Sequence, residues 1–334
     1  MMCGVVVTPL RVEGYGALMP ADSLLVSVPE EPYAAGLADL DGVEVVIWDM
    51  SGPHPRQDEI RLAVPPYQTR LALGDRLRGL ASLEVVQLLT AGYEHLLADV
   101  PDDVTLCNAA GVHDASTAEL AVALTLASIR HLPEFHAAQA SSSWAEPRTW
   151  PALADRRVLL LGYGQIGRAI ASRLVPFEVT VTAVASRPRP GDDLVDSVHG
   201  IDELPDLMAT HDVLIVIVPL TESTRGLVDR DLLARMPDGG VVVNVARGPV
   251  VVTDDLRTEC ASGRLRAALD VTDPEPLPQG HPLWTTPGVL ISPHTGGATK
   301  AMLPRAQRLL RAQVAALRDG RTLMNVVRAA TPRT

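Results

Sequence analysis

The chain has 334 residues, of which 47% are hydrophobic and 21% are charged, and its formal net charge is −11. This length is enough for two domains of ordinary size, and the composition is typical of a soluble globular protein. The acidic balance argues against a nucleic-acid partner, because phosphates attract basic surfaces.

Cys3, Cys107 and Cys260 are widely spaced, and no Cys/His cluster has the pattern of a metal site. We therefore expect free thiols in a reducing cytosol, and no metal. The N-terminus lacks a basic region followed by an apolar stretch of signal-peptide length. The most apolar run, Val213 to Leu220, is too short to span a bilayer. These features predict a cytoplasmic protein without membrane contact.

Residues 1–111 predict a small α/β domain. Short apolar runs alternate with polar breaks that contain Gly or Pro, as expected of strands separated by loops. Continuous apolar runs suit parallel strands that are covered by helices on both faces. The predicted strands are Leu24 to Val28, Val43 to Ile47, Ile60 to Val64 and Val85 to Leu88.

A long helix is predicted next, from about Ser116. Ser116 and Glu119 have the spacing of a capping box, and the run Leu120 to Ile129 is almost wholly apolar. A helix that is apolar on all sides is buried, so we expect it to lie between two domains. The segment Ser141 to Pro151 interrupts the pattern and is predicted to be a loop.

A second alternation of strands and helices starts at Arg157 and predicts a doubly wound parallel sheet. One helix is expected over Gln165 to Val175, and a last one over Ala301 to Leu317, where Pro304 is tolerated in the first turn. The predicted strands are Val158 to Leu161, Val179 to Ala183, Val213 to Val218, Gly240 to Val245, Ala267 to Val271 and Val289 to Ser292.

The last helix follows the final strand of the second sheet, so its expected place is back on the first domain. The sequence thus predicts a discontinuous substrate-binding domain, residues 1–111 and 301–334. Inserted into it is a dinucleotide-binding Rossmann domain, residues 112–300. We expect a cleft between the two domains, since open α/β sheets bind ligands at their carboxyl edges.

The segment LGYGQIG, residues 161–167, is a GxGxxG that follows a strand and opens a helix, which is the context that a dinucleotide site requires. Gly162 permits the tight turn, Gly164 lets the backbone approach the pyrophosphate, and Gly167 lets the helix pack on the strand. The first helical residues, Gln165 and Ile166, bring amide donors to the phosphates. A glycine-rich turn without a ligand is the alternative interpretation.

The end of the next strand indicates which dinucleotide is bound. Ala185 stands where an NAD enzyme usually has Asp or Glu for the ribose hydroxyl, and Ser186, Arg187 and Arg189 follow it. A guanidinium pairs with a 2'-phosphate that a carboxylate would repel. We therefore predict NADP(H) as the preferred cofactor, with NAD(H) as the alternative if Arg187 and Arg189 are ordinary surface charges.

Three further residues lie beyond successive predicted strands: Arg247, Glu275 and His294. At one sheet edge they would form a site for a charged carbonyl substrate. His294 can donate a proton to the carbonyl oxygen as hydride arrives, and Glu275 would favour the protonated imidazole. Arg247 can bind the substrate carboxylate and polarise the carbonyl. Taken singly, each is more often a structural residue or a solvated charge.

The segments GYGQIG, NVARGPVV, ALDVTDPEPLP and ISPHTGGAT resemble, in this order, the motifs of the D-isomer-specific 2-hydroxyacid dehydrogenases. The similarity extends from QLLTAGYEHL near the start to NVV near the end. It implies an α/β fold of two Rossmann-like doubly wound domains, a flavodoxin-like substrate domain with an inserted NAD(P)-binding domain. It also implies a homodimer.

The resemblance also implies roles for individual residues. Arg247, Glu275 and His294 would be the catalytic triad, and the backbone amides of Ala91 and Gly92 would bind the substrate carboxylate together with Arg247. The remaining cofactor contacts that it implies come from Pro219, Ala246 and Asp270, the last with the nicotinamide carboxamide.

Within this family the chain is most similar to the NADPH-dependent glyoxylate/hydroxypyruvate reductases. Glu275 stands where formate dehydrogenases of the family have Gln, and the stretch around Arg187 departs from the NAD pattern. The segment SSSWAEP also resembles that branch, so Trp144 is either a residue that reaches the partner subunit or a packing residue. We predict a reductase of a small 2-keto acid. The alternatives are an NAD-dependent phosphoglycerate-type dehydrogenase and a dinucleotide-sensing, corepressor-like protein.

Overall fold

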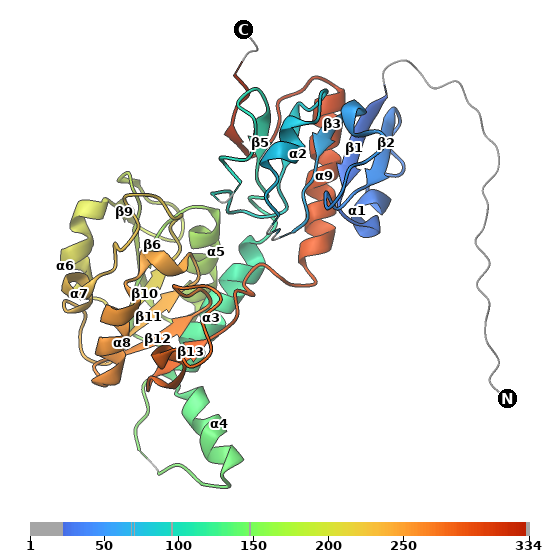
Figure 1. Cartoon of the computed structure of the whole chain (residues 1–334). Helices are drawn as coiled ribbons and strands as arrows, with labels where there is room; N and C mark the ends of the chain where they lie inside the picture. The colour runs from blue at the N-terminus through green and yellow to red at the C-terminus, as the bar shows by residue number, and fades with distance from the viewer. Residues whose placement is uncertain (1–22, 68, 70, 95, 147, 332–334) are drawn as a thin grey trace, which may run out of the picture.

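The computed structural model describes residues 23–331 except positions 68, 70, 95 and 147, so Cys3 lies outside the described residues. Figure 1 shows two lobes, each built around its own sheet. The chain passes from the first lobe to the second along α3 (Asp114–Ile129), and it returns through α9 (Met302–Arg318).

The first sheet has the strand order β14-β5-β4-β3-β1-β2. Its strands are β1 (Leu24–Val28), β2 (Val43–Ile47), β3 (Ile60–Ala63), β4 (Val85–Gln87), β5 (Thr105–Cys107) and β14 (Val326–Arg328). All pairs are parallel except β14 with β5. This order is flavodoxin-like, with the change of winding direction between β1 and β3, as predicted. The sequence missed β5 and β14, because strands of three residues carry too little periodic signal.

Both faces of the first sheet are buried under helices. α1 (Glu31–Ala35) and α9 pack on one face, and α2 (Gly74–Arg78) packs on the other. α9 presents a buried stripe at every fourth residue, Met302, Ala306, Leu310 and Val314. The side-chain amide of Gln307 also donates to the carbonyl of Pro32 at 2.7 Å. The prediction that the last helix packs on the first sheet is therefore confirmed (Figure 1).

The second sheet has the order β13-β12-β11-β10-β6-β7-β9-β8. All pairs are parallel except β8 with β9. The winding direction changes between β6 and β10, which is the Rossmann arrangement. Its strands are β6 (Arg157–Leu161), β7 (Thr180–Val184), β8 (Arg189–Pro190), β9 (Ser197–His199), β10 (Val213–Val216), β11 (Gly240–Asn244), β12 (Leu265–Leu269) and β13 (Val289–Ile291). The sequence predicted all of these except the short β8 and β9.

Helices cover both faces of the second sheet as well. In β6, Val158 and Leu160 pack under α3 and α5 (Gln165–Leu174), whereas Leu159 and Leu161 point to the opposite face. That face is covered by α6 (Leu204–Met208), α7 (Arg230–Leu233) and α8 (Thr253–Ala261). Because both faces of these strands are buried, their sequences are continuous apolar runs. The remaining helices are α4 (Leu132–Ala140) and the short 3₁₀ segments Gln57–Glu59, Val175–Phe177, Ile201–Glu203, Gly248–Val250 and Pro282–Thr285.

The start of α3 differs from the prediction. The helix begins at Asp114, and no side chain caps it. The Ser116 hydroxyl, which the sequence assigned to a capping box, lies 2.8 Å from the Thr299 hydroxyl in the returning segment. The capping-box prediction is wrong because a tertiary contact takes this hydroxyl. Nor is α3 buried on all sides, since Glu119 and Ala123 are exposed. The described part of the segment from Ser141 to Pro151 is a loop, as predicted.

Cys107 and Cys260 are free and buried, and burial raises the pKa of their thiols to about 11 and about 12. These thiols stay protonated and unreactive at neutral pH. No three His, Cys, Asp or Glu side chains among the described residues are placed to share a metal ion. Within the same residues, no helix combines the length and apolarity that a membrane crossing requires.

Candidate active site

The carboxyl ends of three neighbouring parallel strands carry the predicted catalytic residues. Arg247 lies beyond β11, Asp270 directly follows β12, and His294 lies beyond β13. Glu275 follows β12 in the same loop as Asp270. The structure therefore brings together at one sheet edge residues that are up to 47 positions apart in sequence.

His294 and Glu275 form a close pair. Nδ1 of His294 lies 2.6 Å from Oε1 of Glu275. The hydrogen bond with His294, assisted by the charges of His294 and Arg247, lowers the pKa of Glu275. The carboxylate is thus ionised at neutral pH, where it orients the ring and stabilises an imidazolium. Nε2 has no hydrogen bond to any described residue, which leaves it available to a ligand.

Asp270 holds the loop that carries His294. Its side chain is buried, with Oδ1 accepting from the hydroxyl of Ser292 at 2.6 Å and from the amide of Thr295 at 2.9 Å. Oδ2 accepts from the amide of Gly296 at 2.9 Å, and the Asp270 carbonyl accepts from the His294 amide at 2.8 Å. The resemblance assigned Asp270 only to the nicotinamide, so this anchoring of the loop was not predicted.

Asn244 is a second anchor that the sequence missed. This buried residue ends β11, and its Oδ1 accepts from the amide of Ala246 at 3.0 Å. Its Nδ2 donates to the carbonyl of Arg247 at 3.0 Å, so the amide group shapes the turn that presents the arginine. A polar residue at the end of the apolar run GVVVN was the available signal.

The guanidinium of Arg247 faces the loop after β4 in the other lobe. A Cβ atom added to Gly92 would lie 1.6 Å from Nη2 of Arg247, so the loop can approach the arginine only with glycine there. Nη2 also lies 3.6 Å from Oε2 of Glu94, an acidic neighbour that the sequence did not single out. Within the described chain, the amides of Ala91 and Gly92 have no hydrogen-bond acceptor. They remain free to donate to an anion.

The glycine-rich loop has the features that a dinucleotide requires. Gly162 has φ +115°, and a Cβ there would lie 2.5 Å from the carbonyl of Ile217, at the point where β6 and β10 diverge. A Cβ on Gly167 would lie 2.3 Å from the carbonyl of Gly162. A Cβ on Gly164 would meet nothing within 4 Å. Open space therefore lies at the N-terminus of α5, where Gln165 and Ile166 begin the helix. This arrangement fits a pyrophosphate at a helix N-terminus.

Gly164 and Gly167 predict a matched pair of substitutions. Gly164→Ala should leave the thermal stability of the apo protein nearly unchanged and weaken binding of the dinucleotide, because its methyl group occupies the open space. Gly167→Ala should destabilise the fold by about 1–3 kcal/mol, as overpacking does. Thermal unfolding and cofactor titration of both variants test this. Equal loss of stability in the two variants would contradict it.

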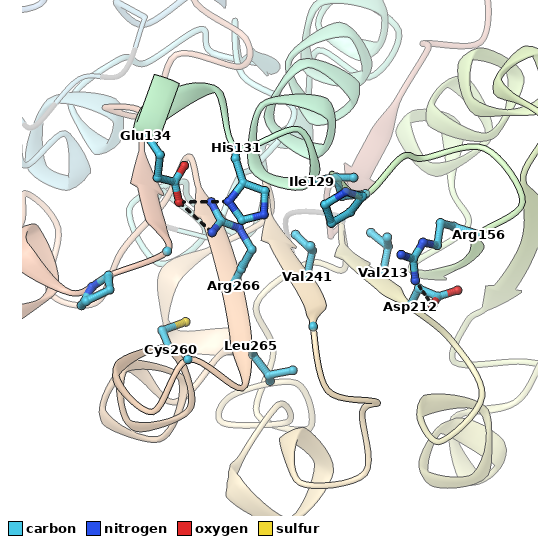
Figure 2. Close-up of a pocket in the computed structure, with 15 residues that line it drawn as sticks. Ile129, His131, Glu134, Arg156, Asp212, Val213, Val241, Cys260, Leu265 and Arg266 are labelled. Carbon is cyan, nitrogen blue, oxygen red and sulfur yellow. Dashed lines mark hydrogen bonds and ion pairs between the residues drawn. The ribbon is translucent and has the colours of Figure 1, made fainter. Parts of the chain in front are cut away.

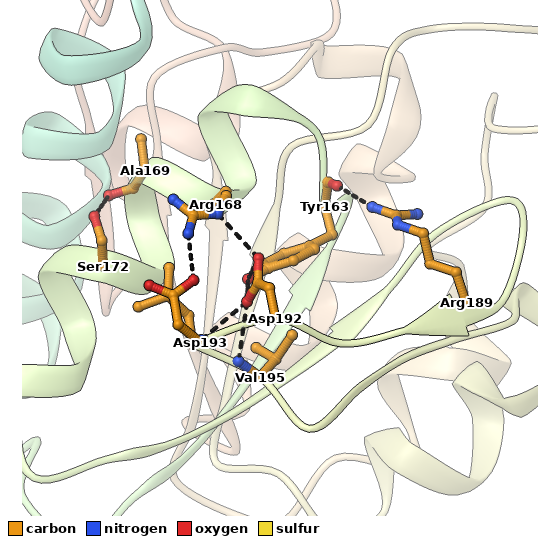
Figure 3. A network of polar contacts seen from close by, with 9 residues as sticks. Tyr163, Arg168, Ala169, Ser172, Arg189, Asp192, Asp193 and Val195 are labelled. Carbon is orange, nitrogen blue, oxygen red and sulfur yellow. Dashed lines mark hydrogen bonds and ion pairs between the residues drawn. The ribbon is translucent and has the colours of Figure 1, made fainter.

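The residues beyond β7 fall into two groups. Ser186 and Arg187 are exposed, and within the described chain their side chains have no hydrogen-bond or ion-pair partner. Arg189 is engaged: its Nη2 donates to the carbonyl of Tyr163 in the glycine-rich loop at 2.6 Å (Figure 3). The same tyrosine donates its hydroxyl to Asp192 at 2.9 Å. Arg189 thus supports the cofactor loop, whereas the Arg187 side chain has no partner among the residues that the structure describes.

The other predicted cofactor residues also lie at this edge. Pro219 follows β10, is exposed, and accepts a hydrogen bond from the Thr224 hydroxyl on its carbonyl at 2.7 Å. Ala246 is buried in the turn before Arg247.

Tyr67, which follows β3, was not predicted from the sequence. Burial raises the pKa of its phenol, and the charges of Arg247 and Asp270 act on that pKa in opposite directions.

A cavity of about 280 Å³ lies elsewhere, at the amino ends of the strands of the second sheet. Figure 2 shows Arg266 and His131 directed toward Glu134 at one end of it, and Arg156 paired with Asp212 at the other. The cavity is on the opposite edge of the sheet from His294. It is therefore separate from the candidate active site.

Comparison with known proteins agrees with this geometry. Residues 122–296 match the family model of the D-isomer specific 2-hydroxyacid dehydrogenase, NAD binding domain. The chain is 35% identical over 286 residues to a glyoxylate reductase/hydroxypyruvate reductase of Mus musculus, covering 81% of this chain and 87% of that protein. A glyoxylate/hydroxypyruvate reductase A of Photorhabdus laumondii is 30% identical, with 74% of this chain and 79% of that protein covered.

Among solved structures, a D-isomer specific 2-hydroxyacid dehydrogenase from Xanthobacter autotrophicus Py2, in complex with NADPH and MES, aligns with a TM-score of 0.79 at 29% identity. The alignment covers 92% of this chain and 98% of that one. The fold and the site define an oxidoreductase that acts on CH–OH groups with NAD(P). The chain belongs to the D-isomer specific 2-hydroxyacid dehydrogenase family.

Proposed function

We propose that this protein reduces glyoxylate, hydroxypyruvate or a similar small 2-keto acid with NADPH, using His294 as the acid/base. The observation that carries the proposal is the 2.6 Å pair of His294 with Glu275, at the same edge as Arg247. The relatives named as glyoxylate/hydroxypyruvate reductases support the substrate class. Ala185 in place of an acid, and the unpaired Arg187, support NADPH.

The cofactor would lie along the carboxyl edge of the second sheet. The loop from Gly162 to Gly167 and the N-terminus of α5 would hold its pyrophosphate. Ser186 and Arg187 would bind the 2'-phosphate, and the nicotinamide end would lie among Pro219, Ala246 and Asp270. When bound, the nicotinamide supplies the hydride.

The rest of the chemistry belongs to side chains of this chain. Arg247 and the amides of Ala91 and Gly92 bind the substrate carboxylate, which orients the keto group. Negative charge develops on the carbonyl oxygen as C2 is reduced, and Nε2 of His294 gives that oxygen its proton. Glu275 stabilises the imidazolium before the transfer, and solvent restores the proton afterwards.

Glu275→Gln should shift the pH dependence of reduction. In the native pair, the pKa of Glu275 is lowered, so its carboxylate stays ionised down to a lower pH than an ordinary glutamate would. The imidazolium of His294 therefore has a charged partner at neutral pH. Without that charge the imidazolium loses its stabilising partner, so the alkaline limb of kcat/KM should move to lower pH. Profiles of both proteins from pH 5 to 9.5 test this, and superimposable alkaline limbs would contradict it.

The function itself is tested with a panel of 2-keto acids, measuring the oxidation of NADPH and of NADH. We expect the highest kcat/KM with glyoxylate or hydroxypyruvate and NADPH. A strong preference for NADH would favour an NAD-dependent 2-hydroxyacid dehydrogenase. Tight NADPH binding without turnover of any keto acid would favour a dinucleotide-sensing protein.

We also propose a cytoplasmic homodimer, with the substrate domain formed by residues 1–111 and 301–334 and the cofactor domain by residues 112–300. α4 contains no buried residue, Leu132 is 50% exposed, and Trp144 in the following loop is 94% exposed. Apolar side chains exposed in this way are typical of a surface that a partner covers. Light scattering of the purified protein should give twice the mass of one chain.

A further inference from the structure

His113 occupies the junction between the two lobes. It directly precedes α3, at the point where the chain leaves the first sheet, and only 4% of its surface is exposed. Its Nε2 lies 2.7 Å from the carbonyl of Leu89, and its Nδ1 lies 3.2 Å from the carbonyl of Gly297. One buried ring therefore contacts segments from both lobes.

Both contacts connect directly to the active site. Leu89 precedes the loop of Ala91 and Gly92, and Gly297 lies three residues after His294 in the loop that leads to α9. Asp270 accepts a hydrogen bond from the amide of Gly296 in that second loop, and His113 contacts the carbonyl of the adjacent Gly297. The ring of His113 thus lies between the segment that leads into the Ala91–Gly92 loop and the segment that carries His294.

The chemistry of the two contacts requires a particular state of the ring. A carbonyl oxygen only accepts hydrogen bonds, and a neutral imidazole has a single N–H. In the neutral ring, one nitrogen would direct its lone pair at a carbonyl oxygen, in a buried place where an unsatisfied polar contact is costly. Only the imidazolium donates to both carbonyls.

The groups around the ring are one aromatic ring and one acid. Tyr67 lies beside it, with ring centroids 5.7 Å apart, and contributes a neutral phenol. Asp114 is the adjacent acid; burial raises the pKa of its carboxyl, and the charges of His113 and Arg305 act in the opposite direction. The charges of Arg247 and Asp270 act on the pKa of Tyr67 in opposite directions.

We propose that His113 is a positioning residue whose protonated ring links the substrate loop to the His294 loop across the domain junction. Loss of the proton breaks the longer contact, to Gly297, and loosens the alignment of the two loops. Substrate binding then weakens as pH rises, in addition to any effect of pH on the His294 proton donor. The kinetic part of this inference rests on the proposed function, whereas the protonation state of the ring does not.

The protonation state is measured first, on the full-length protein labelled with ¹⁵N-histidine. Long-range ¹H–¹⁵N spectra identify the His113 signal by its loss in His113→Gln, or in His113→Asn if the glutamine variant does not fold. We expect both ring nitrogens to have imidazolium shifts at pH 7. A neutral, single-tautomer signal at pH 7 would overturn the proposal, whatever the protein reduces.

The kinetic arm compares KM for glyoxylate at pH 6.5 and 8.5 in wild type and His113→Gln. We expect the substitution to raise KM about tenfold at pH 6.5, equivalent to about 1.4 kcal/mol, and to change kcat much less. The rise of KM with pH should be larger in wild type than in the variant. The matched control is His211→Gln, a buried histidine bonded to Thr182 and Leu207 far from the site. The same KM ratio between the two pH values in wild type and His113→Gln would refute the link.

Discussion

His294→Ala should lower kcat for keto-acid reduction by about 10²–10⁴-fold, the usual contribution of a positioned general acid. Nε2 of His294 is the proton donor in the proposed mechanism, and its partner on Nδ1, Glu275, is held at 2.6 Å. NADPH affinity should change by less than about threefold, because the cofactor contacts come from other loops. Stopped-flow turnover and fluorescence titration of NADPH separate the two effects.

A matched control is available in the same domain. His199 also has a carboxylate partner, with Nδ1 2.7 Å from Glu203, but this histidine ends β9 and does not lie beyond β11 to β13. His199→Ala should therefore leave kcat nearly unchanged. Unimpaired turnover in His294→Ala would remove His294 from the proton-transfer role and leave the rest of the fold assignment intact.

Arg187→Ala should weaken NADPH binding by about 10–100-fold, since hydrogen bonds to charged groups contribute about 1.5–3 kcal/mol. NADH has no 2'-phosphate, so its affinity should change by less than about twofold. The exposed, unpaired side chain of Arg187 can approach a phosphate without breaking an existing contact. Dissociation constants for both cofactors, at one fixed ionic strength, measure the difference.

Arg189 and Arg230 provide the comparisons for this result. Arg189→Ala removes the hydrogen bond to the carbonyl of Tyr163, so it should weaken both cofactors by distorting the glycine-rich loop. Arg230→Ala removes an exposed arginine on α7 and should affect neither cofactor, which controls for net charge. If Arg187→Ala weakened NADH as much as NADPH, the 2'-phosphate assignment would be wrong.

The roles of the glycines show how far local sequence can predict geometry. Gly162, Gly164 and Gly167 were assigned a tight turn, an open approach and a close packing contact, and the Cβ environments in the structure match these three descriptions. Such requirements are local, because they depend on one strand, one turn and one helix. The sequence did not predict the short strands β5, β8, β9 and β14. These strands are defined only by their pairing with a neighbouring strand, which is not a local property of the sequence.

The anchors of the site could not be predicted in the same way. Asn244 and Asp270 hold backbone amides, and His113 meets two carbonyls that come from segments 208 residues apart in the chain. The carboxyl of Asp270 and the hydroxyl of Ser116 each have several potential partners in the sequence. Which partner they contact depends on how the two lobes, and the two chain segments that connect them, pack together.

The sequence by itself determined the two alternating α/β units and the return of the last helix, and it predicted Arg247, Glu275 and His294 as the catalytic set. Apolar runs, turn glycines and strand-end positions follow from local periodicity and from the rule that parallel strands share one edge. Only the tertiary structure decided that Arg247 faces Gly92, that Asp270 fastens the His294 loop, and that Arg189 is engaged while Arg187 is free. These contacts join distant segments, and their geometry exists only after both sheets have packed.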